Sequence, residues 1–218
     1  MELSGARVLV VGATGVLGGL AACALAERGA QVALAGRNPV RLAALAQDLG
    51  APPARGFEAC DLDQCTALGA WAARMLSGLD GVLVTVGAMG FGAVEDVSNA
   101  AAEHLLTVNA LCPMAVLRGA APVVADKGFL LAVTGTPPER SHIEGTADYT
   151  ASKAALSGWL GVLAEELAPR SVAVLDIPVP HLDTGFADRP LIGRPPLLPP
   201  GADALETVIS LMDELASA

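Results

Sequence analysis

Hydrophobic positions along this chain fall into short apolar runs that alternate with longer stretches of helical periodicity. The short runs predict six strands, at 7–11, 31–35, 55–59, 81–86, 129–134 and 172–177. The longer stretches predict helices at 17–28, 39–49, 64–76, 100–121, 149–167 and 203–215. Pro39 at the first turn of the second helix and Gly50 after its end are expected boundary signals, and Pro113 predicts a bend within the fourth.

Strict alternation of strands and helices predicts right-handed crossovers, and therefore a doubly wound, mostly parallel α/β sheet of about six strands with helices on both faces. The composition agrees, because 53% of the 218 residues are hydrophobic but only 3% are aromatic, which leaves Ala, Val and Leu to build the core. The length suits one domain over 1–218, with no repeat or linker to divide it. We expect the Pro-rich loop at 178–200 to pack over a substrate or cofactor site.

The net charge and the cysteine content narrow the range of possible partners and sites. A formal net charge of −10 argues against nucleic acid and against an anionic membrane surface. The four cysteines form no Cys-x-x-Cys pair and the three histidines are scattered, so neither a metal site nor a disulfide framework is indicated. The amino terminus has no signal-peptide pattern, and Gly, Pro or charge interrupts each apolar run before the roughly 18 residues of a membrane span. We therefore expect a cytoplasmic protein.

A glycine-rich turn follows the first strand and opens the first helix. In Gly12-x-x-Gly15-x-x-Gly18, small residues let the backbone approach a pyrophosphate at a helix amino end, where free N–H groups favour an anion. This position in the chain makes the pattern specific for a dinucleotide. The expected cofactor contacts here are Gly12, Thr14, Gly15, Leu17 and Gly18.

The end of the second strand indicates which dinucleotide is bound. An NAD site usually places a carboxylate here for the ribose 2′-hydroxyl, whereas this chain has Gly36 and then Arg37. An arginine would pair with a 2′-phosphate through a charge-assisted fork. NADP(H) is therefore favoured over NAD(H).

The one tyrosine of the chain, Tyr149, precedes Lys153 by four residues, and Lys153 is one of only two lysines. Four residues is about one helical turn, so both side chains can share a helix face. An ammonium close to a phenol favours the phenolate, which predicts a lowered pKa for Tyr149 and a proton-transfer pair. Asp148 is expected to be the N-cap of that helix.

With the glycine turn at the start and Tyr149 and Lys153 late in a six-strand chain, residues 5–188 resemble the short-chain dehydrogenase/reductase family, which has the Rossmann fold. The resemblance implies that Tyr149 is the general acid or base and that Lys153 lowers its pKa and holds the nicotinamide ribose. It also implies that Asn109 anchors a water in the proton relay. A hydroxyl that polarises the substrate carbonyl falls to Thr136, which stands 13 residues before Tyr149, with Thr134 as the alternative.

The same resemblance implies further cofactor contacts. Asp61 and Leu62 match the adenine-contacting pair after the third strand, Gly87 matches a small residue beside the cofactor, and Thr184 matches a threonine that meets the carboxamide or phosphates. The implied activity is hydride transfer between NADP(H) and a small carbonyl or alcohol substrate. A homodimer through the long helices is expected.

Departures from the family pattern keep other functions open. Residues 85–88 replace the usual Asn-Asn-Ala-Gly, residues 178–181 replace a Pro-Gly, and the glycine turn has its second glycine one residue early. The departures at 85–88, at 178–181 and at 135–136, where Thr136 stands at the family's serine position, favour as an alternative a non-catalytic NADP(H)-binding regulatory or partner-binding protein of the same fold. A third possibility is an epimerase or dehydratase that uses hydride transfer only transiently.

Overall fold

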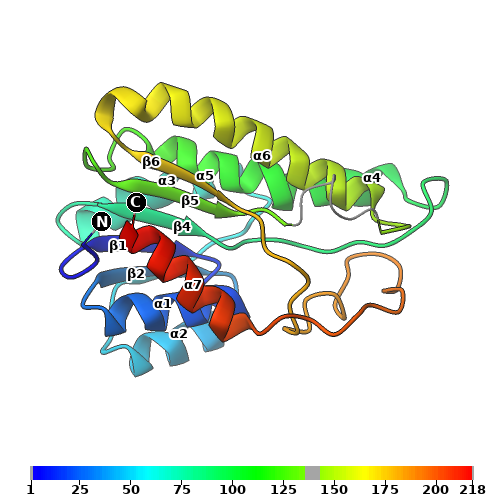
Figure 1. Cartoon of the computed structure of the whole chain (residues 1–218), viewed down its shortest axis with the longest axis horizontal. Coiled ribbons are helices and arrows are strands. Elements are labelled where there is room, and N and C mark those ends of the chain that lie inside the picture. Colours follow the sequence, from blue (N-terminus) through cyan, green and yellow to red (C-terminus); the bar gives the residue numbers. More distant parts are fainter. Residues whose placement is uncertain (1, 136–142, 218) are drawn as a thin grey trace.

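A computed structural model gives the fold and describes residues 2–135 and 143–217 (Figure 1). Six parallel strands form one sheet in the order β3-β2-β1-β4-β5-β6. The strands are β1 Arg7–Val11, β2 Gln31–Gly36, β3 Ala54–Gly56, β4 Gly81–Val84, β5 Phe129–Val133 and β6 Ala173–Ile177. The strand order reverses between β1 and β4, which places the ligand crevice of a doubly wound sheet at the carboxyl ends of these two strands. The predicted doubly wound parallel sheet is confirmed.

Helices cover both faces of the sheet. They are α1 Val16–Glu27, α2 Pro39–Asp48, α3 Leu62–Met75, α4 Asn99–Leu106, α5 Cys112–Ala120, α6 Ala147–Leu167 and α7 Ala204–Ser217, with short turns η1 Thr107–Leu111 and η3 Ala168–Arg170. In Figure 1, α3, α5 and α6 lie above the sheet, and α1, α2 and α7 lie below it. Two apolar clusters result, one on each face. They bury β1, β4 and β5 almost completely, as expected of parallel strands.

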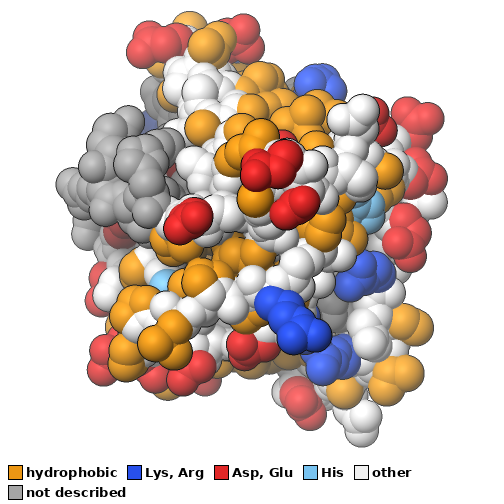
Figure 2. All heavy atoms as spheres, turned by 90° about the vertical axis from the view of Figure 1, so that its right-hand side faces the viewer, with side chains coloured by type: hydrophobic (Ala, Val, Ile, Leu, Met, Phe, Trp, Pro, Cys, Tyr) orange, Lys and Arg blue, Asp and Glu red, His pale blue; other side chains and the backbone are white. Residues whose placement is uncertain are grey.

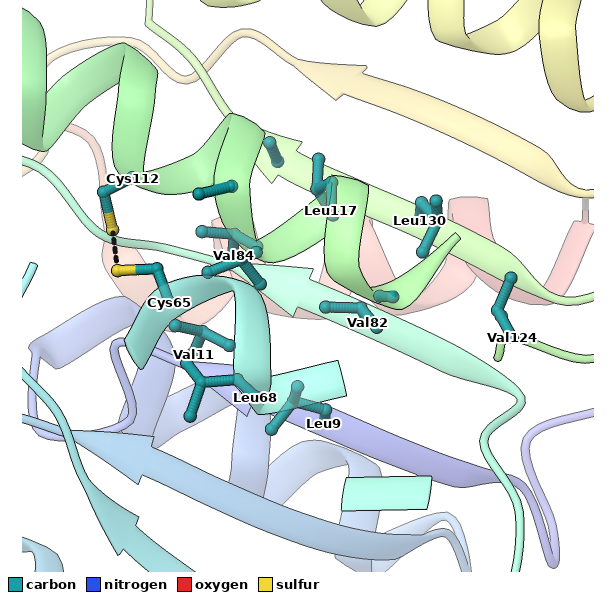
Figure 3. Close-up of a cluster of buried hydrophobic side chains, with 14 of the residues drawn as sticks. Leu9, Val11, Cys65, Leu68, Val82, Val84, Cys112, Leu117, Val124 and Leu130 are labelled. Atoms are coloured by element: carbon teal, nitrogen blue, oxygen red, sulfur yellow. Dashed lines mark hydrogen bonds between the residues drawn. The ribbon is translucent and has the colours of Figure 1, made fainter. Parts of the chain in front are cut away.

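Figure 3 shows the cluster on the α3 and α5 side. Leu68 of α3 and Leu117 of α5 pack over aliphatic side chains of the sheet, and each is fully buried. At one end of this cluster the buried Cys65 thiol donates to the Cys112 sulfur over 3.6 Å. The thiol of Cys65 raises the pKa of Cys112, and burial raises it further.

The stretch predicted as one helix at 100–121 is interrupted by a π-helical turn, η1. The sequence analysis placed a bend near Pro113, and the structure places the irregularity one turn earlier, around Asn109. Pro113 has no N–H, so it cannot donate the regular i→i−4 bond to the carbonyl of Asn109. In the π-turn, Cys112 N–H instead bonds the Thr107 carbonyl five residues back.

The 22 residues Asn99–Ala120, which comprise α4, η1 and α5, are long and apolar enough to cross a membrane by length and composition alone. From the sequence we expected no such stretch, because Gly, Pro or charge interrupts each apolar run. Half of its most apolar 18-residue window is buried inside the fold. Packing of α4 and α5 against the sheet, α3 and α6 accounts for this hydropathy.

Two helix starts show how caps set the boundaries. Helix α6 begins at Ala147 rather than Tyr149, so the predicted N-cap at Asp148 is wrong and Thr146 holds that position. Asp148 lies in the first turn instead, where the helix dipole stabilises a carboxylate. At α7 the Asp203 carboxylate accepts from Glu206 N–H over 2.8 Å, a regular N-cap.

The Pro-rich segment after β6 is tied to the loop after β4. Leu191 N–H donates to the Met89 carbonyl over 2.7 Å, and Phe91 N–H donates to the Ile192 carbonyl over 2.9 Å. A β-bridge between Leu182 and Ala202 joins the two ends of the segment. The segment therefore runs beside the carboxyl edge of the sheet, at the right of Figure 1.

Candidate active site

The glycine turn between β1 and α1 is closely packed against the loop after β4. Gly12 has a φ of +94°, and a Cβ there would lie 2.5 Å from Thr85 Oγ1. A Cβ at Gly18 would lie 2.3 Å from the Gly12 carbonyl oxygen. Only glycine fits both positions, and Gly15 is the N-cap of α1 without a side-chain cap. The amide N–H groups of the first turn of α1 are thus available to an anion such as a pyrophosphate.

The residues after β2 adjoin this turn. A Cβ at Gly36 would lie 2.6 Å from Thr14 Cγ2, so the end of β2 touches the glycine turn. Arg37 follows directly and is exposed. Asn38 is used locally, because its Oδ1 caps α2 by accepting from Arg41 N–H over 3.0 Å. Arg37 is therefore the charged side chain at this corner.

Asp61 and Leu62 lie at the amino end of α3. The Asp61 carboxylate caps α3 by accepting from Gln64 N–H over 3.0 Å and from Gln64 Nε2 over 2.7 Å. The bond from Gln64 N–H holds the pKa of Asp61 below its usual range. Leu62 is half-buried against the core. The predicted adenine-contacting pair thus has a structural role of its own at the carboxyl edge of the sheet.

Tyr149 and Lys153 lie one turn apart on α6, as predicted. Lys153 is 8% exposed, and its Nζ donates to the Val133 carbonyl at the end of β5 over 3.1 Å. The ring of Tyr149 packs against the apolar cluster of Met89, Phe91 and Ala187. The lysine thus crosses from the helix to the sheet, while the tyrosine faces the loops above the strand ends.

Burial is the largest influence on the pKa of Tyr149 and on that of Lys153. It raises the pKa of Tyr149 to about 12 and lowers the pKa of Lys153 to about 8. The negative charge of Asp176 opposes the change at Lys153. The predicted lowering of the Tyr149 pKa is wrong, because the Lys153 ammonium bonds the Val133 carbonyl and burial of the phenol dominates.

Asn109 is fully buried in the π-turn η1 and joins three parts of the site. Its Oδ1 accepts from Ala88 N–H over 2.8 Å, and its Nδ2 donates to the Ala88 carbonyl over 2.9 Å. The same Nδ2 donates to Ser152 Oγ over 3.0 Å, and Ser152 Oγ donates to the Tyr149 carbonyl over 2.6 Å. The asparagine side chain therefore fixes the loop after β4 relative to the Tyr149 turn of α6.

Two glycines mark where these groups meet. A Cβ at Gly87 would lie 3.4 Å from Asn109 Oδ1 and 3.5 Å from both Lys153 Nζ and Phe186 Cζ. A Cβ at Gly135 would lie 3.4 Å from the Tyr149 hydroxyl. The ends of β4 and β5 thus border the polar atoms of α6 and η1.

The two threonines predicted as alternative carbonyl polarisers, Thr134 and Thr136, flank Gly135. Thr136 lies outside the residues that the structure describes, but its neighbour Gly135 borders the Tyr149 hydroxyl. Thr134 is 5% exposed, and its hydroxyl donates to Asp176 Oδ1 over 2.5 Å. The Thr134 hydroxyl therefore already has an acceptor away from Tyr149.

Thr184 and Phe186 belong to the segment after β6. Thr184 is half-buried, and its N–H donates to the Leu182 carbonyl over 2.9 Å. Phe186 reaches the position beside Gly87 and packs on the same apolar cluster as Tyr149. The Pro-rich segment consequently supplies one wall of the site.

Figure 2 looks onto the carboxyl edge of the sheet, where these loops meet. Hydrophobic side chains occupy much of its centre, and Lys and Arg side chains gather at the lower right. In the part of the chain that the structure describes, no three His, Cys, Asp or Glu side chains come together as a metal site would require.

Sequence reasoning missed Ser152, Asp176 and Phe186. Asp176 had a readable signal, because it is a carboxylate inside the otherwise apolar strand β6. Ser152 had none, since its bond to Asn109 joins residues 43 positions apart. Phe186 could have been noted as an aromatic residue in a loop expected to cover the site.

A parallel 3-2-1-4-5-6 sheet with a glycine turn at its switch point defines a Rossmann-type nucleotide-binding protein. The family profile described as short chain dehydrogenase matches residues 6–190. The chain therefore belongs to the short-chain dehydrogenase family, whose members are oxidoreductases that bind nicotinamide cofactors.

Individual relatives agree with this membership. The chain is 29% identical over 192 residues to nodulation protein G of Rhizobium meliloti (strain 1021), covering 86% of this chain and 78% of that protein. A Thermus thermophilus protein assigned to the short-chain oxidoreductases is 30% identical with a TM-score of 0.82, over 96% of this chain and 95% of its own. A short chain dehydrogenase from Burkholderia cenocepacia J2315, solved in complex with NADP, is 25% identical with a TM-score of 0.84. The match covers 97% of this chain and 90% of that protein.

Proposed function

We propose that this protein is an NADP(H)-dependent oxidoreductase that transfers a hydride between the nicotinamide and a small carbonyl or alcohol substrate, with Tyr149 as the general acid or base. The observation that carries the proposal is the placement of Tyr149, Lys153 and Asn109 together at the carboxyl edge of the sheet, beside Gly87 and Gly135. A protein that only bound the dinucleotide would have no need of the tyrosine hydroxyl.

The cradle around the glycine turn fits a dinucleotide. In this proposal Gly12, Gly15 and Gly18, with Thr14 and Leu17, hold the pyrophosphate on the first turn of α1. Near the other end of the site, the nicotinamide would lie beside Gly87 and Lys153, and Thr184 of the segment 178–200 would contact it. The bound cofactor supplies or accepts the hydride.

The residues after β2 would determine whether NADP(H) or NAD(H) is bound. Arg37 is exposed next to the glycine turn, with no carboxylate at Gly36, and would bind the 2′-phosphate of NADP(H). Asp61 and Leu62 would border the adenine from the start of α3. The NADP complex of the Burkholderia cenocepacia relative supports this choice over NAD(H).

Proton transfer falls to Tyr149. A phenol with its pKa raised to about 12 holds its proton near neutral pH, which suits a donor to the alkoxide that forms as a carbonyl is reduced. Tyr149 would therefore act as the proton donor when a carbonyl is reduced. Lys153 would bring its charge to the nicotinamide ribose and the phenol, and Asn109 would anchor a water through which the proton is replaced.

The carbonyl-polarising hydroxyl is assigned to Thr136. Its neighbour Gly135 borders the Tyr149 hydroxyl, whereas the Thr134 hydroxyl is bonded to Asp176. The proposal further includes one domain over 1–218, a cytoplasmic location and a homodimer formed through the long helices.

The proposal is tested by mixing the protein with NADPH and a panel of aldehydes, ketones and quinones and following NADPH oxidation. Turnover of at least one carbonyl, with NADPH preferred to NADH, is expected. Binding of NADPH without any turnover would instead favour the non-catalytic regulatory protein, which the departures at 85–88 and 178–181 suggest.

A further inference from the structure

A half-buried carboxylate, Asp176, lies on β6, the strand next to the one that Lys153 contacts. Asp176 belongs to β6, and its neighbour in the register is Ala132 of β5. Lys153 Nζ bonds the carbonyl of Val133, the next residue along β5. The Asp176 carboxylate and the Lys153 ammonium thus both lie at the carboxyl end of β5.

Two hydroxyl groups hold Asp176 in place. Thr134 Oγ1 donates to one carboxylate oxygen over 2.5 Å, and Ser157 Oγ donates to the other. Two donors suit an ionised carboxylate, which can only accept hydrogen bonds. Ser157 lies four residues after Lys153 and therefore on the same face of α6, one turn along.

We propose that Asp176 is a positioning residue for Lys153: its negative charge keeps the buried ammonium protonated, and its two hydroxyl bonds fix the Lys153–Ser157 turn of α6 against the ends of β5 and β6. The role in reduction rests on the proposed function, whereas the charge pairing does not. The other residues of β6 are apolar and Asp176 is half-buried among them, so its carboxylate needs hydrogen-bond donors or an opposite charge nearby.

The titratable groups around Lys153 come from four elements, β6, α5, α6 and α3. Asp176 of β6 and the sulfur of Cys112, at the start of α5, favour the protonated amine, while burial opposes it. Tyr149 stands one turn earlier on the same helix, and Cys65 of α3 bonds Cys112 from behind. Among these groups, Asp176 is the carboxylate, and two hydroxyl groups donate hydrogen bonds to it.

The charge of Lys153 can be observed directly, because the chain has only two lysines, Lys127 and Lys153. In whole protein labelled with 13C-lysine, the Cε signals report each lysine separately as pH is varied by NMR. The unmodified protein should give a Lys153 midpoint at about 8. In Asp176→Asn that midpoint should fall by about one pH unit or more, since the opposite charge is gone.

Matched variants separate charge from structure. Thr134→Val and Ser157→Ala each remove one hydroxyl but keep the carboxylate, so they should move the Lys153 midpoint much less than Asp176→Asn. Asp80→Asn removes a carboxylate from the other end of the sheet, where it pairs with Arg7, and should not move it. If Asp176→Asn does not fold, Asp176→Ser takes its place as the test. It also removes the charge and can keep a hydrogen bond, so its Lys153 midpoint should fall by about one pH unit or more.

Activity is a separate readout. In Asp176→Asn, the loss of turnover at high pH should begin at a lower pH, by the same interval as the NMR midpoint. An unchanged Lys153 midpoint in folded Asp176→Asn or Asp176→Ser would overturn the proposal even if the enzyme is active. A lowered midpoint in a protein that turns over no carbonyl would uphold the charge pairing and reject the proposed function.

Discussion

At the scale of single residues, cofactor choice depends on Arg37. It is exposed directly after the contact between Gly36 and the glycine turn, and no carboxylate stands in its place. Arg37→Ala should therefore lose most of the preference for NADPH over NADH. A charge-assisted contact corresponds to roughly 10- to 150-fold in the dissociation constant. Fluorescence titration with both cofactors measures this, and equal affinities in the unmodified protein would contradict the assignment.

The carbonyl-polarising hydroxyl is also a single-residue question. Thr136→Val should lower turnover without weakening NADPH binding, because it removes one hydrogen-bond donor from the reacting carbonyl. Thr134→Val should be milder, since its hydroxyl already donates to Asp176. Steady-state kinetics on both variants ranks them, and the opposite ranking would move the role to Thr134.

Sequence reasoning about single residues succeeded where the spacing along one element carries the information. The Tyr149 and Lys153 turn of α6 follows from helical geometry alone. The pKa of Tyr149 did not follow, because it depends on burial by Met89 and Phe91, which come from another part of the chain. Asp176 likewise acquires its role only from tertiary neighbours.

At the scale of elements, the first turn of α1 packs closely against the glycine turn that precedes it. Gly18→Ala would place a Cβ 2.3 Å from the Gly12 carbonyl oxygen and should displace the helix from the turn. We expect a loss of about 1–3 kcal/mol in the free energy of unfolding, the usual effect of overpacking, and NADPH affinity at least about tenfold lower.

Gly19→Ala is the matched control on the next residue of α1. Its Cβ would lie 3.4 Å from the Ala13 carbonyl oxygen, an ordinary contact, and alanine favours a helix. Urea unfolding and NADPH titration should leave this variant close to the unmodified protein. Equal effects of the two substitutions would show that the tight turn is not required.

The succession of strands and helices along the chain could be predicted from the sequence, because the alternation of apolar runs and helical periodicity is strong throughout. The details that failed are those that depend on backbone hydrogen bonds. Strand β3 is only Ala54–Gly56, shorter than the predicted 55–59, and the bend assigned to Pro113 is a π-turn around Asn109. Periodicity does not report whether a carbonyl bonds four or five residues ahead.

At the scale of the whole molecule, stability should depend on pH through the buried lysine. The pKa of Lys153 is about 8 when folded against 10.5 for a free lysine, so the unfolded chain binds more protons between these values. The contribution of Lys153 to stability therefore rises as pH increases from about 8 to 10.5. Urea unfolding of the unmodified protein and of Lys153→Met should diverge in this direction, and a constant difference would contradict the burial of the charge.

The central claim is that Tyr149 transfers the proton. The most direct test is the turnover number of Tyr149→Phe on a carbonyl that the unmodified protein reduces with NADPH, with cofactor affinity and unfolding measured alongside. Only the hydroxyl is removed, so affinity and stability should be nearly unchanged while turnover falls by about 10²- to 10⁴-fold. Full turnover in Tyr149→Phe would contradict the account.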